Sequence, residues 1–190
     1  DISRVVFLIS IVSANEVSAY DVIQNLFPDK NKDFVFNITE TEIVLVKEIK
    51  AGIDNKDLEK LARSISDTLS GEFFTKVNVG IGTPVTGIKD LARSFKEAQI
   101  AIEVGKVFDT DKTIVSYDNL GIARLIYHLP TTLCETFLKE VFKKGSIESL
   151  VHETLFTIQR FFENNLNVSE TSRKLFVHRN TLVYRLDKIK

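Results

Sequence analysis

The stretch DFVFNITETEIVLVKEI (Asp33–Ile49) predicts a β-hairpin inside a mixed domain. Residues 33–38 alternate apolar and polar side chains, and residues 42–49 are mostly apolar and β-branched, so both segments are typical of strands. Only Thr-Glu-Thr separates them, which leaves room for nothing but a tight turn. The hairpin therefore provides two neighbouring antiparallel strands, around which the flanking segments have to be placed.

The segment before the hairpin predicts a strand followed by a helix. RVVFLISIV (4–12) is a continuous apolar run of strand length, as expected for a buried strand. Ser13 or Asn15 can cap a helix over roughly 15–27, because their side-chain oxygens accept hydrogen bonds from the first helical amides. That helix should end before Pro28.

The segment after the hairpin predicts two more helices and two more strands. Asp54 caps a helix over 54–73 whose apolar residues recur at helical spacing. The core face of that helix consists of Leu58, Leu61, Ile65 and Leu69. Residues 76–83 predict a strand, 88–108 a helix that ends near Gly105, and 111–117 a last short strand. The resulting order, βαββαβαβ, is a split βαβ arrangement in which we expect helices on one face of a mainly antiparallel sheet.

From Asp118 onward the sequence contains only helical patterns, so the fold class is α+β. We expect a mixed domain over residues 1–117 and a helical domain over 118–190. Segments 118–129, 131–142 and 146–165 predict helices, and two shorter ones follow. Their positions are 169–176 and 179–190.

The composition indicates a globular, cytoplasmic protein. Hydrophobic residues make up 44% and charged residues 27% of the chain, and no apolar run approaches the roughly 20 residues that cross a bilayer. The one cysteine, Cys134, excludes an internal disulfide and fits a reducing compartment; it is either a nucleophile or, as we expect, a structural residue. Because the chain begins at Asp1, we expect it to be a fragment of a longer protein.

The closing stretch, SETSRKLFVHRNTLVYRLDKIK (Ser169–Lys190), predicts two short helices joined by a tight connection. Ser169 is the expected N-cap of the first helix. In the second helix Leu182, Leu186 and Ile189 fall on one face and should pack inward. Residues 164–190 carry a net charge of +4, whereas the rest of the chain carries −5. A basic end on an acidic body favours a polyanionic partner, although a solvated helix face gives the same balance.

The polar residues of the second helix suit the recognition helix of a helix-turn-helix. Such a helix lays its N-terminal half in the major groove of DNA, so that half needs side chains that bind bases. Arg can pair with guanine O6 and N7, and Asn can pair with adenine N6 and N7. Thr, Tyr and Lys can bind phosphates, as can the helix N-terminus itself. Any amphipathic helical hairpin shares part of this pattern.

The run NVSETSRKLFVHRNTLVYRLDKIK (167–190) resembles the C-terminal helix-turn-helix of the PucR/CdaR family of bacterial transcription regulators, with HRNTLVYRLDKI (178–189) as its signature. The resemblance implies a positioning helix and turn over 168–177 and a recognition helix over 179–190. The DNA-contact residues predicted from it and from the helix chemistry are His178, Arg179, Asn180, Thr181, Tyr184, Arg185, Lys188 and Ser169. Two departures are Ser172, where the family usually has Ala for close packing, and the end at Lys190, short of the family's closing helix.

The mixed domain resembles the degenerate cyclase-like (GGDEF-type) domain of CdaR-type regulators. The resemblance rests on VNVGIGTPVTGIKDLARSFKEAQIAIEVGK (77–106), and YDNLGIARLIYHLP (117–130) resembles the segment that opens the region before the DNA-binding domain. It thus covers almost the whole chain, with a nucleotide-cyclase-like fold over the mixed domain.

The catalytic pattern of a diguanylate cyclase is missing from this sequence. The hairpin reads Asn-Ile-Thr-Glu-Thr-Glu (37–42), without the glycines that admit a nucleotide, and Ile9–Ser13 holds no second metal-binding carboxylate. Glu40 and Glu42 are expected to be surface charges. Gly80 and Gly82 are expected inside a strand, where close helix packing or a bulge explains them.

We therefore expect a scaffold domain with no catalytic residue, no metal and no cofactor. The histidines His128, His152 and His178 are too far apart in sequence for a local metal motif. The alternative is a nucleotide-binding or diguanylate-cyclase-like enzyme. A second alternative is an interaction module whose terminal helices bind protein.

The expected function is that of a DNA-binding transcription regulator that controls carbohydrate diacid or related catabolic genes. Its partners would be double-stranded DNA, a second copy in a homodimer, and a small-molecule effector bound by an N-terminal domain outside this chain. No membrane partner is expected. Binding to DNA should weaken steeply with added salt, because counterions are released when Lys and Arg neutralise phosphates.

Overall fold

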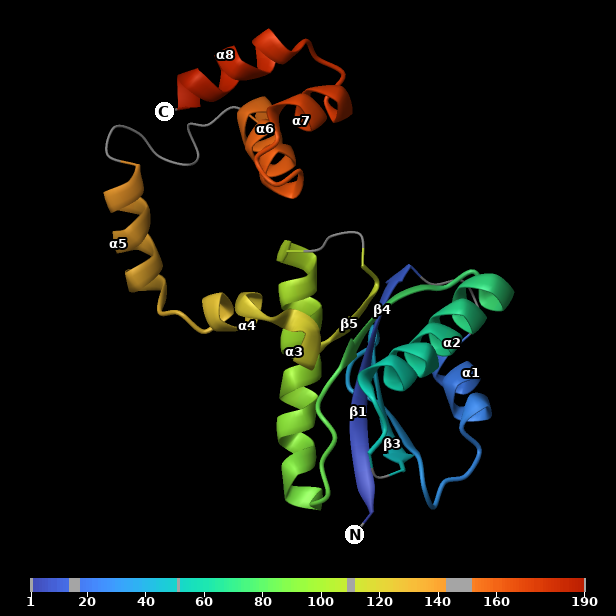
Figure 1. The fold of residues 1–190 in the computed structure, drawn as a ribbon. Coiled ribbons are helices and arrows are strands. Elements are labelled where there is room, and N and C mark those ends of the chain that lie inside the picture. Colours follow the sequence, from blue (N-terminus) through green and yellow to red (C-terminus); the bar gives the residue numbers. More distant parts are fainter. Residues whose placement is uncertain (1, 14–17, 51, 109–111, 143–151, 190) are drawn as a thin grey trace. The chain divides into compact units, whose positions relative to one another are not determined.

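The computed structural model describes residues 2–13, 18–50, 52–108, 112–142 and 152–189 (Figure 1). It divides into two compact units, Asp1–His128 and Leu129–Lys190. The elements are β1 (Ser3–Ser13), α1 (Ala19–Leu26), β2 (Phe34–Asn37), β3 (Glu42–Ile49), α2 (Asn55–Phe73), β4 (Lys76–Ile81), the 3-10 helix η1 (Ile88–Asp90), α3 (Leu91–Phe108), β5 (Ile114–Ser116), the 3-10 helix η2 (Tyr117–Leu120), α4 (Ile122–Tyr127), α5 (Thr131–Val141), α6 (His152–Glu163), α7 (Val168–Lys174) and α8 (Arg179–Ile189).

The first unit contains a five-stranded sheet in the order β2-β3-β1-β4-β5. All neighbouring strands are antiparallel except β4 and β5, which are parallel. β2 and β3 form the predicted hairpin, with Phe34 opposite Val46 and Asn37 opposite Ile43. The structure thus confirms the α+β class and the order βαββαβαβ. The predicted domain limits, 1–117 and 118–190, stay a prediction, and the first compact unit also includes α4.

Helices cover both faces of the sheet, so the prediction of a single covered face was wrong. On one face Phe7 and Ile9 of β1 pack with the apolar sides of α1 and α2. On the other face Val6 and Leu8 pack with Ala98 and other residues of α3, and Figure 1 shows α3 across the sheet from α1 and α2. A strand with two covered faces is apolar at every position, which explains the continuous run in β1.

The helix starts of the first unit are set by side-chain caps. Asp54 caps α2 as predicted, since its carboxylate accepts from the backbone N–H of Asp57 at 2.8 Å. The N-cap of α1 is Ser18, which accepts from the N–H of Asp21. Ser13 lies in β1 and does not cap α1, while Asn15 lies outside the described residues.

Two glycines allow α3 to lie close to the sheet. A Cβ on Gly80, within β4, would come 2.1 Å from the Ala98 carbonyl oxygen, so close helix packing accounts for this glycine as expected. Gly82 follows the strand and meets α3 in the same way. Gly105 does not end α3, which continues to Phe108. A Cβ on Gly105 would come 2.7 Å from Val115 Cγ2, so this glycine makes room for β5.

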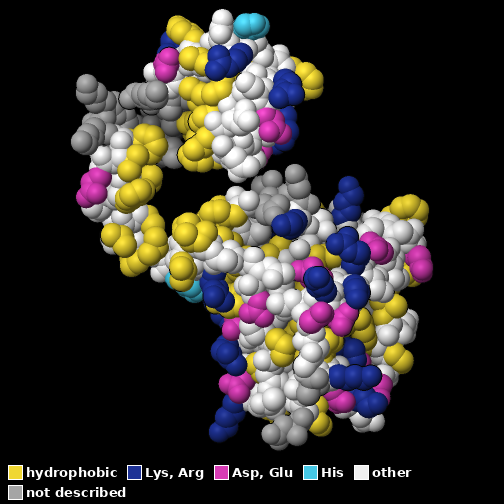
Figure 2. All heavy atoms as spheres, viewed as in Figure 1, with side chains coloured by type: hydrophobic (Ala, Val, Ile, Leu, Met, Phe, Trp, Pro, Cys, Tyr) yellow, Lys and Arg dark blue, Asp and Glu magenta, His cyan; other side chains and the backbone are white. Residues whose placement is uncertain are grey.

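The second unit consists of four described helices, α5 to α8. In α5 none of the described side chains is buried, and Figure 2 shows hydrophobic side chains along it (yellow). Leu133, Phe137 and Val141 of α5 are all exposed. The predicted helix over 146–165 is present as α6, and its positions 146–151 lie outside the described residues. Nowhere in the described part of the chain is a helix long and apolar enough to cross a membrane.

Candidate nucleic-acid interface

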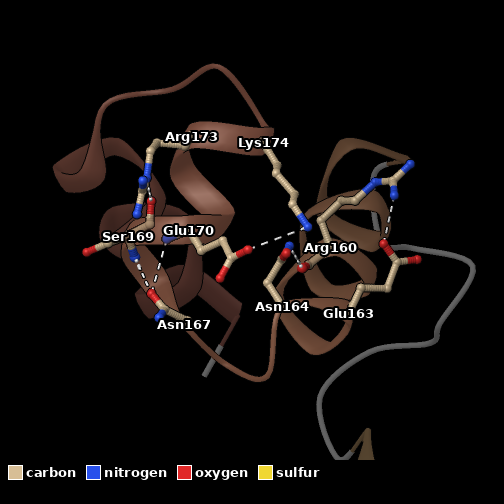
Figure 3. Close-up of polar contacts among 8 residues, drawn as sticks. All are labelled: Arg160, Glu163, Asn164, Asn167, Ser169, Glu170, Arg173 and Lys174. Carbon is tan, nitrogen blue, oxygen red and sulfur yellow. Dashed lines mark hydrogen bonds and ion pairs between the residues drawn. The ribbon is translucent and has the colours of Figure 1, made fainter.

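The first helix of the predicted helix-turn-helix is α7, and its N-cap is Asn167. The Asn167 side-chain oxygen accepts from the backbone N–H groups of Ser169 and Glu170 at 3.0 and 3.1 Å (Figure 3). Ser169 was predicted as the cap, but it lies in the first turn and is a donor to the cap. Asn in this position fills the same physical role as the predicted Ser, because both side chains accept from the first free amides.

The turn between α7 and α8 is closed by backbone hydrogen bonds. Phe176 adopts a left-handed conformation with φ of 54°, and its N–H donates to the Arg173 carbonyl at 3.2 Å. The N–H of Val177 donates to the Ser172 carbonyl at 3.0 Å. This pair of bonds is a Schellman motif, which ends one helix and fixes the direction of the chain into the next. The Phe176 side chain is 96% exposed.

The inward face of α8 is fixed by Leu182, which is fully buried. This confirms the prediction for Leu182. Leu186 is half-buried, and the side chain of Ile189 lies outside the described residues. On α7 Ser172 is buried where the resemblance led us to expect a small residue for close helix packing, and its hydroxyl donates to the Ser169 carbonyl at 3.0 Å.

Most of the predicted contact residues are exposed on this pair of helices or immediately before α8. The exposed ones are Ser169, His178, Arg179, Asn180, Thr181, Tyr184 and Lys188. His178 immediately precedes α8, and its Nδ1 accepts from the Asn180 N–H at 3.3 Å. The ammonium group of Lys188 lies 4.7 Å from the centre of the Tyr184 ring. Figure 2 shows Lys and Arg side chains on the surface of this unit (dark blue).

Arg185 differs from the other predicted contact residues because it is half-buried and tied to another helix. Its Nη2 lies 2.5 Å from Oε1 of Glu153, in the first turn of α6, and the Arg185 side chain is 31% exposed. Arg185 follows Leu182 by three positions, so both lie toward the same side of α8. The guanidinium thus forms an ion pair that bridges α6 and α8.

Sequence reasoning missed a set of buried polar residues where α6, α7 and α8 meet. The missed residues are Thr157, Asn164 and Thr171. Thr157 donates to the Glu153 carbonyl at 2.7 Å. Asn164 donates to the Arg160 carbonyl at 2.6 Å (Figure 3), so both side chains bond to the backbone of α6. A sequence signal was available only in retrospect, because Thr157 and Thr171 occupy helix positions that an apolar pattern assigns to aliphatic side chains.

The surface of the α6–α7 junction carries interacting charges. Glu163 accepts from Gln159 Nε2 at 2.9 Å. It also accepts from Arg160 Nη1 at 2.7 Å (Figure 3). The hydrogen bond from Gln159 is the main cause that lowers the pKa of Glu163, with Arg160 and the more distant charge of Lys174 acting in the same direction. Lys174 itself lies 3.7 Å from Glu170, four residues earlier in α7.

The cyclase-like hairpin presents no assembled metal site in the structure. Glu40 is exposed in the β2–β3 turn, and the turn is closed by the Ile38 N–H, which donates to the Glu42 carbonyl at 2.9 Å. In the described ranges no group of three or more His, Cys, Asp or Glu side chains gathers in a geometry that could hold a metal ion. Cys134 lies half-buried in α5, and His152 begins α6 at the surface.

Two known domains match the sequence, and one match falls within each compact unit. A GGDEF-like domain matches residues 1–104, and the PucR C-terminal helix-turn-helix domain matches residues 154–190. The first match covers β1 to β4 with α1, α2 and most of α3, and the second covers α7, α8 and most of α6.

Several curated proteins are similar over large parts of the chain. The purine catabolism regulatory protein of Bacillus subtilis (strain 168) is 29% identical over 63% of this chain and 23% of its own length. The carbohydrate diacid regulator of Escherichia coli (strain K12) is 25% identical over 85% of this chain and 43% of its own length. The proline-responsive transcriptional activator PutR of Bacillus subtilis is 28% identical over 60% of this chain and 29% of its own length.

The chain thus spans less than half the length of each of these relatives. Its two matched domains occur in the order that the resemblance of the sequence implied. The chain belongs to the PucR/CdaR family of transcription regulators, and it carries the family's GGDEF-like domain and C-terminal helix-turn-helix.

Proposed function

We propose that this chain binds double-stranded DNA through α7 and α8 and acts as a cytoplasmic transcription regulator. The observation that carries the proposal is the first turn of α8. Arg179, Asn180 and Thr181 are all exposed there, while Leu182, the next residue, is fully buried. A helix anchored in this way offers its N-terminal side chains to a major groove without disturbing its own packing.

The chemistry of the exposed residues divides into base reading and backbone contact. Arg179 and Asn180 have the side chains that pair with guanine and adenine edges, so we assign base contact to them. Thr181, Tyr184 and Lys188 suit phosphate oxygens, which fix the register of the protein on the duplex. His178, immediately before α8, and Ser169, in the first turn of α7, are exposed as well and complete the proposed surface.

We propose a homodimer as the active form, because two helix-turn-helix units that read two half-sites multiply specificity. The similarity to the carbohydrate diacid regulator and to the purine catabolism regulatory protein supports control of catabolic genes, with carbohydrate diacid genes as one candidate set. The effector would bind to a further N-terminal domain. The GGDEF-like unit would serve as a scaffold without catalysis.

The test of DNA binding uses a duplex selected by the 190-residue chain from a pool of random sequences. Fluorescence anisotropy then gives the affinity of the wild type and of Arg179→Ala. We expect Arg179→Ala to weaken binding by about 1–3 kcal/mol and to relax the preference at one base pair. The control is Arg63→Ala in α2, which removes an exposed Arg from the other unit and should leave the affinity unchanged.

An equal loss of affinity for every duplex would show that Arg179 contacts a phosphate. Unchanged affinity would show that Arg179 makes no contact with DNA. A wild type that selects no duplex would contradict the proposed function as a whole. The absence of catalysis is tested separately, by incubation with GTP and Mg²⁺ or Mn²⁺. Formation of a cyclic dinucleotide would show that the GGDEF-like unit is an enzyme.

A further inference from the structure

Arg185 stands apart from the other cationic side chains of α8 because its charge is already paired within the unit. Its Nη2 lies 2.5 Å from the Glu153 carboxylate. Arg179, in contrast, is exposed at the start of the same helix. A guanidinium that is paired with a carboxylate displaces fewer counterions from DNA when it binds a phosphate. The reason is that its charge is already partly neutralised in the free protein.

The position of the pair on the two helices suits a structural role. Leu182 is the only described residue of α8 whose side chain is buried, so it fixes one point of the helix against its neighbours. Val183 and Leu186 are only half-buried, so apolar packing constrains the rotation of α8 about its axis less than a fully buried face would. Arg185 lies one turn after Leu182 and joins α6 through Glu153, which supplies a further fixed point for this rotation.

We propose that Arg185 is a positioning residue, and this proposal rests on the proposed function. Its ion pair with Glu153 holds α8 in the orientation that presents Arg179 and Asn180 to the duplex, and it makes no DNA contact of its own. The sequence pattern placed Arg185 among the DNA-contact residues. The geometry points to an indirect role in recognition.

The test exchanges the two charges. Arg185→Glu and Glu153→Arg are each made alone and then together in the full chain, and anisotropy measures affinity for the duplex selected by the wild type. Each single variant places like charges at the α6–α8 contact, so each should bind about three- to tenfold more weakly. The double variant should return to within about twofold of the wild type, because it restores an ion pair.

Glu153→Arg is the most informative single variant. It adds a positive charge, so a general electrostatic effect on a polyanion would tighten binding, whereas loss of positioning weakens it. The salt dependence gives a second measure. In Arg185→Leu the slope of log affinity against log salt should equal that of the wild type, while loss of a phosphate contact would reduce the slope by about one. Arg185→Lys, which keeps the charge, should bind nearly as the wild type.

A matched control exchanges the charges of Asp57 and Lys60, an ion pair of 2.7 Å on α2 in the other unit. That exchange should leave DNA affinity unchanged. Far-UV circular dichroism shows whether each variant keeps its helices. If the wild type binds but the double variant of Arg185 and Glu153 stays as weak as Arg185→Glu, Arg185 contacts DNA and the inference is wrong while the proposed function stands. If the wild type binds no duplex, both are wrong.

Discussion

The two compact units bury different kinds of side chain. In the GGDEF-like unit the core is aliphatic and aromatic, and β1 alone contributes five consecutive buried residues from Val5 to Ile9. In the described part of the helical unit, Leu182 is the only buried apolar residue, and the other four buried residues are polar. Burial of apolar area is the main source of folding free energy, so the helical unit depends far more on a few contacts and caps.

This difference relates to the roles that we propose for the two units. A scaffold gains from a large core, because its strands and helices then hold one arrangement. A recognition unit has to keep polar and cationic side chains at its surface, and α8 keeps Arg179, Asn180 and Thr181 exposed. The helical unit thus exposes the residues that we propose to bind DNA at the expense of residues that stabilise. Four changes test this contrast.

The largest effect is expected from Leu182→Ala. It removes the one buried apolar side chain of the described helical unit and should cost about 3 kcal/mol, through lost burial and a residual cavity. Hydrogen exchange of the α8 amides should become fast, while exchange in β1 stays slow. The matched control is Phe162→Ala, which removes an exposed side chain of α6 and should change little. Slow exchange of α8 in Leu182→Ala would show that other contacts hold the helix.

Gly80→Ala should destabilise the GGDEF-like unit by about 2 kcal/mol. The added Cβ would approach the Ala98 carbonyl to 2.1 Å, so α3 has to move off the sheet. Urea unfolding followed by circular dichroism measures the loss. In Gly71→Ala the new Cβ meets nothing within 4 Å, and the change inside α2 should raise stability by about 0.5–1 kcal/mol. The opposite signs of these two Gly→Ala changes are the expectation to be checked.

Asn167→Ala should destabilise α7 by about 1 kcal/mol, because two backbone amides lose their acceptor. Ser169→Ala should have little effect on stability, since Ser169 is not the cap. Chemical-shift measures of helicity over α7 compare the two variants. A larger loss of α7 helicity in Ser169→Ala than in Asn167→Ala would show that Ser169 is the N-cap, as the sequence predicted.

The smallest effect is expected in the pH dependence of stability, through the Glu163 carboxylate. Its pKa is lowered mainly by the hydrogen bond from Gln159, so the folded state favours the charged carboxylate. The resulting stabilisation is present above the unfolded pKa of this group and is lost as the pH falls through the folded pKa. NMR titration should place the pKa of Glu163 below its ordinary value, and Gln159→Ala should raise it. No rise in Gln159→Ala would mean that Arg160 supplies the effect.

The sequence predicted the order of elements in the GGDEF-like unit because its signals are local. The hairpin of Asp33–Ile49 and the cap at Asp54 each depend on neighbouring residues. The number of covered faces depends on packing between distant elements, and the run in β1 is the signal that was overlooked. Gly105 was taken for a helix end because its partner, Val115, comes from another element.

For the candidate interface, the sequence predicted which side chains are exposed and which are buried where this follows from helical spacing. This spacing buries Leu182 and exposes Asn180, Tyr184 and Lys188, and the structure agrees. Arg185 could not be separated from these residues by spacing alone, because its partner Glu153 lies on another helix. The Asn167 cap was missed because Asn167 and Ser169 are both good capping residues, and only the start of the helix decides between them.

The central claim, that α8 enters the major groove, is tested most directly by dimethyl-sulfate interference on the selected duplex. Methylation of guanine N7 changes the major groove, and methylation of adenine N3 changes the minor groove. We predict that methylated guanines at the site block binding of the wild type, and that Arg179→Ala loses the interference at one of them. Interference confined to adenines, or none at any base, would contradict the claim.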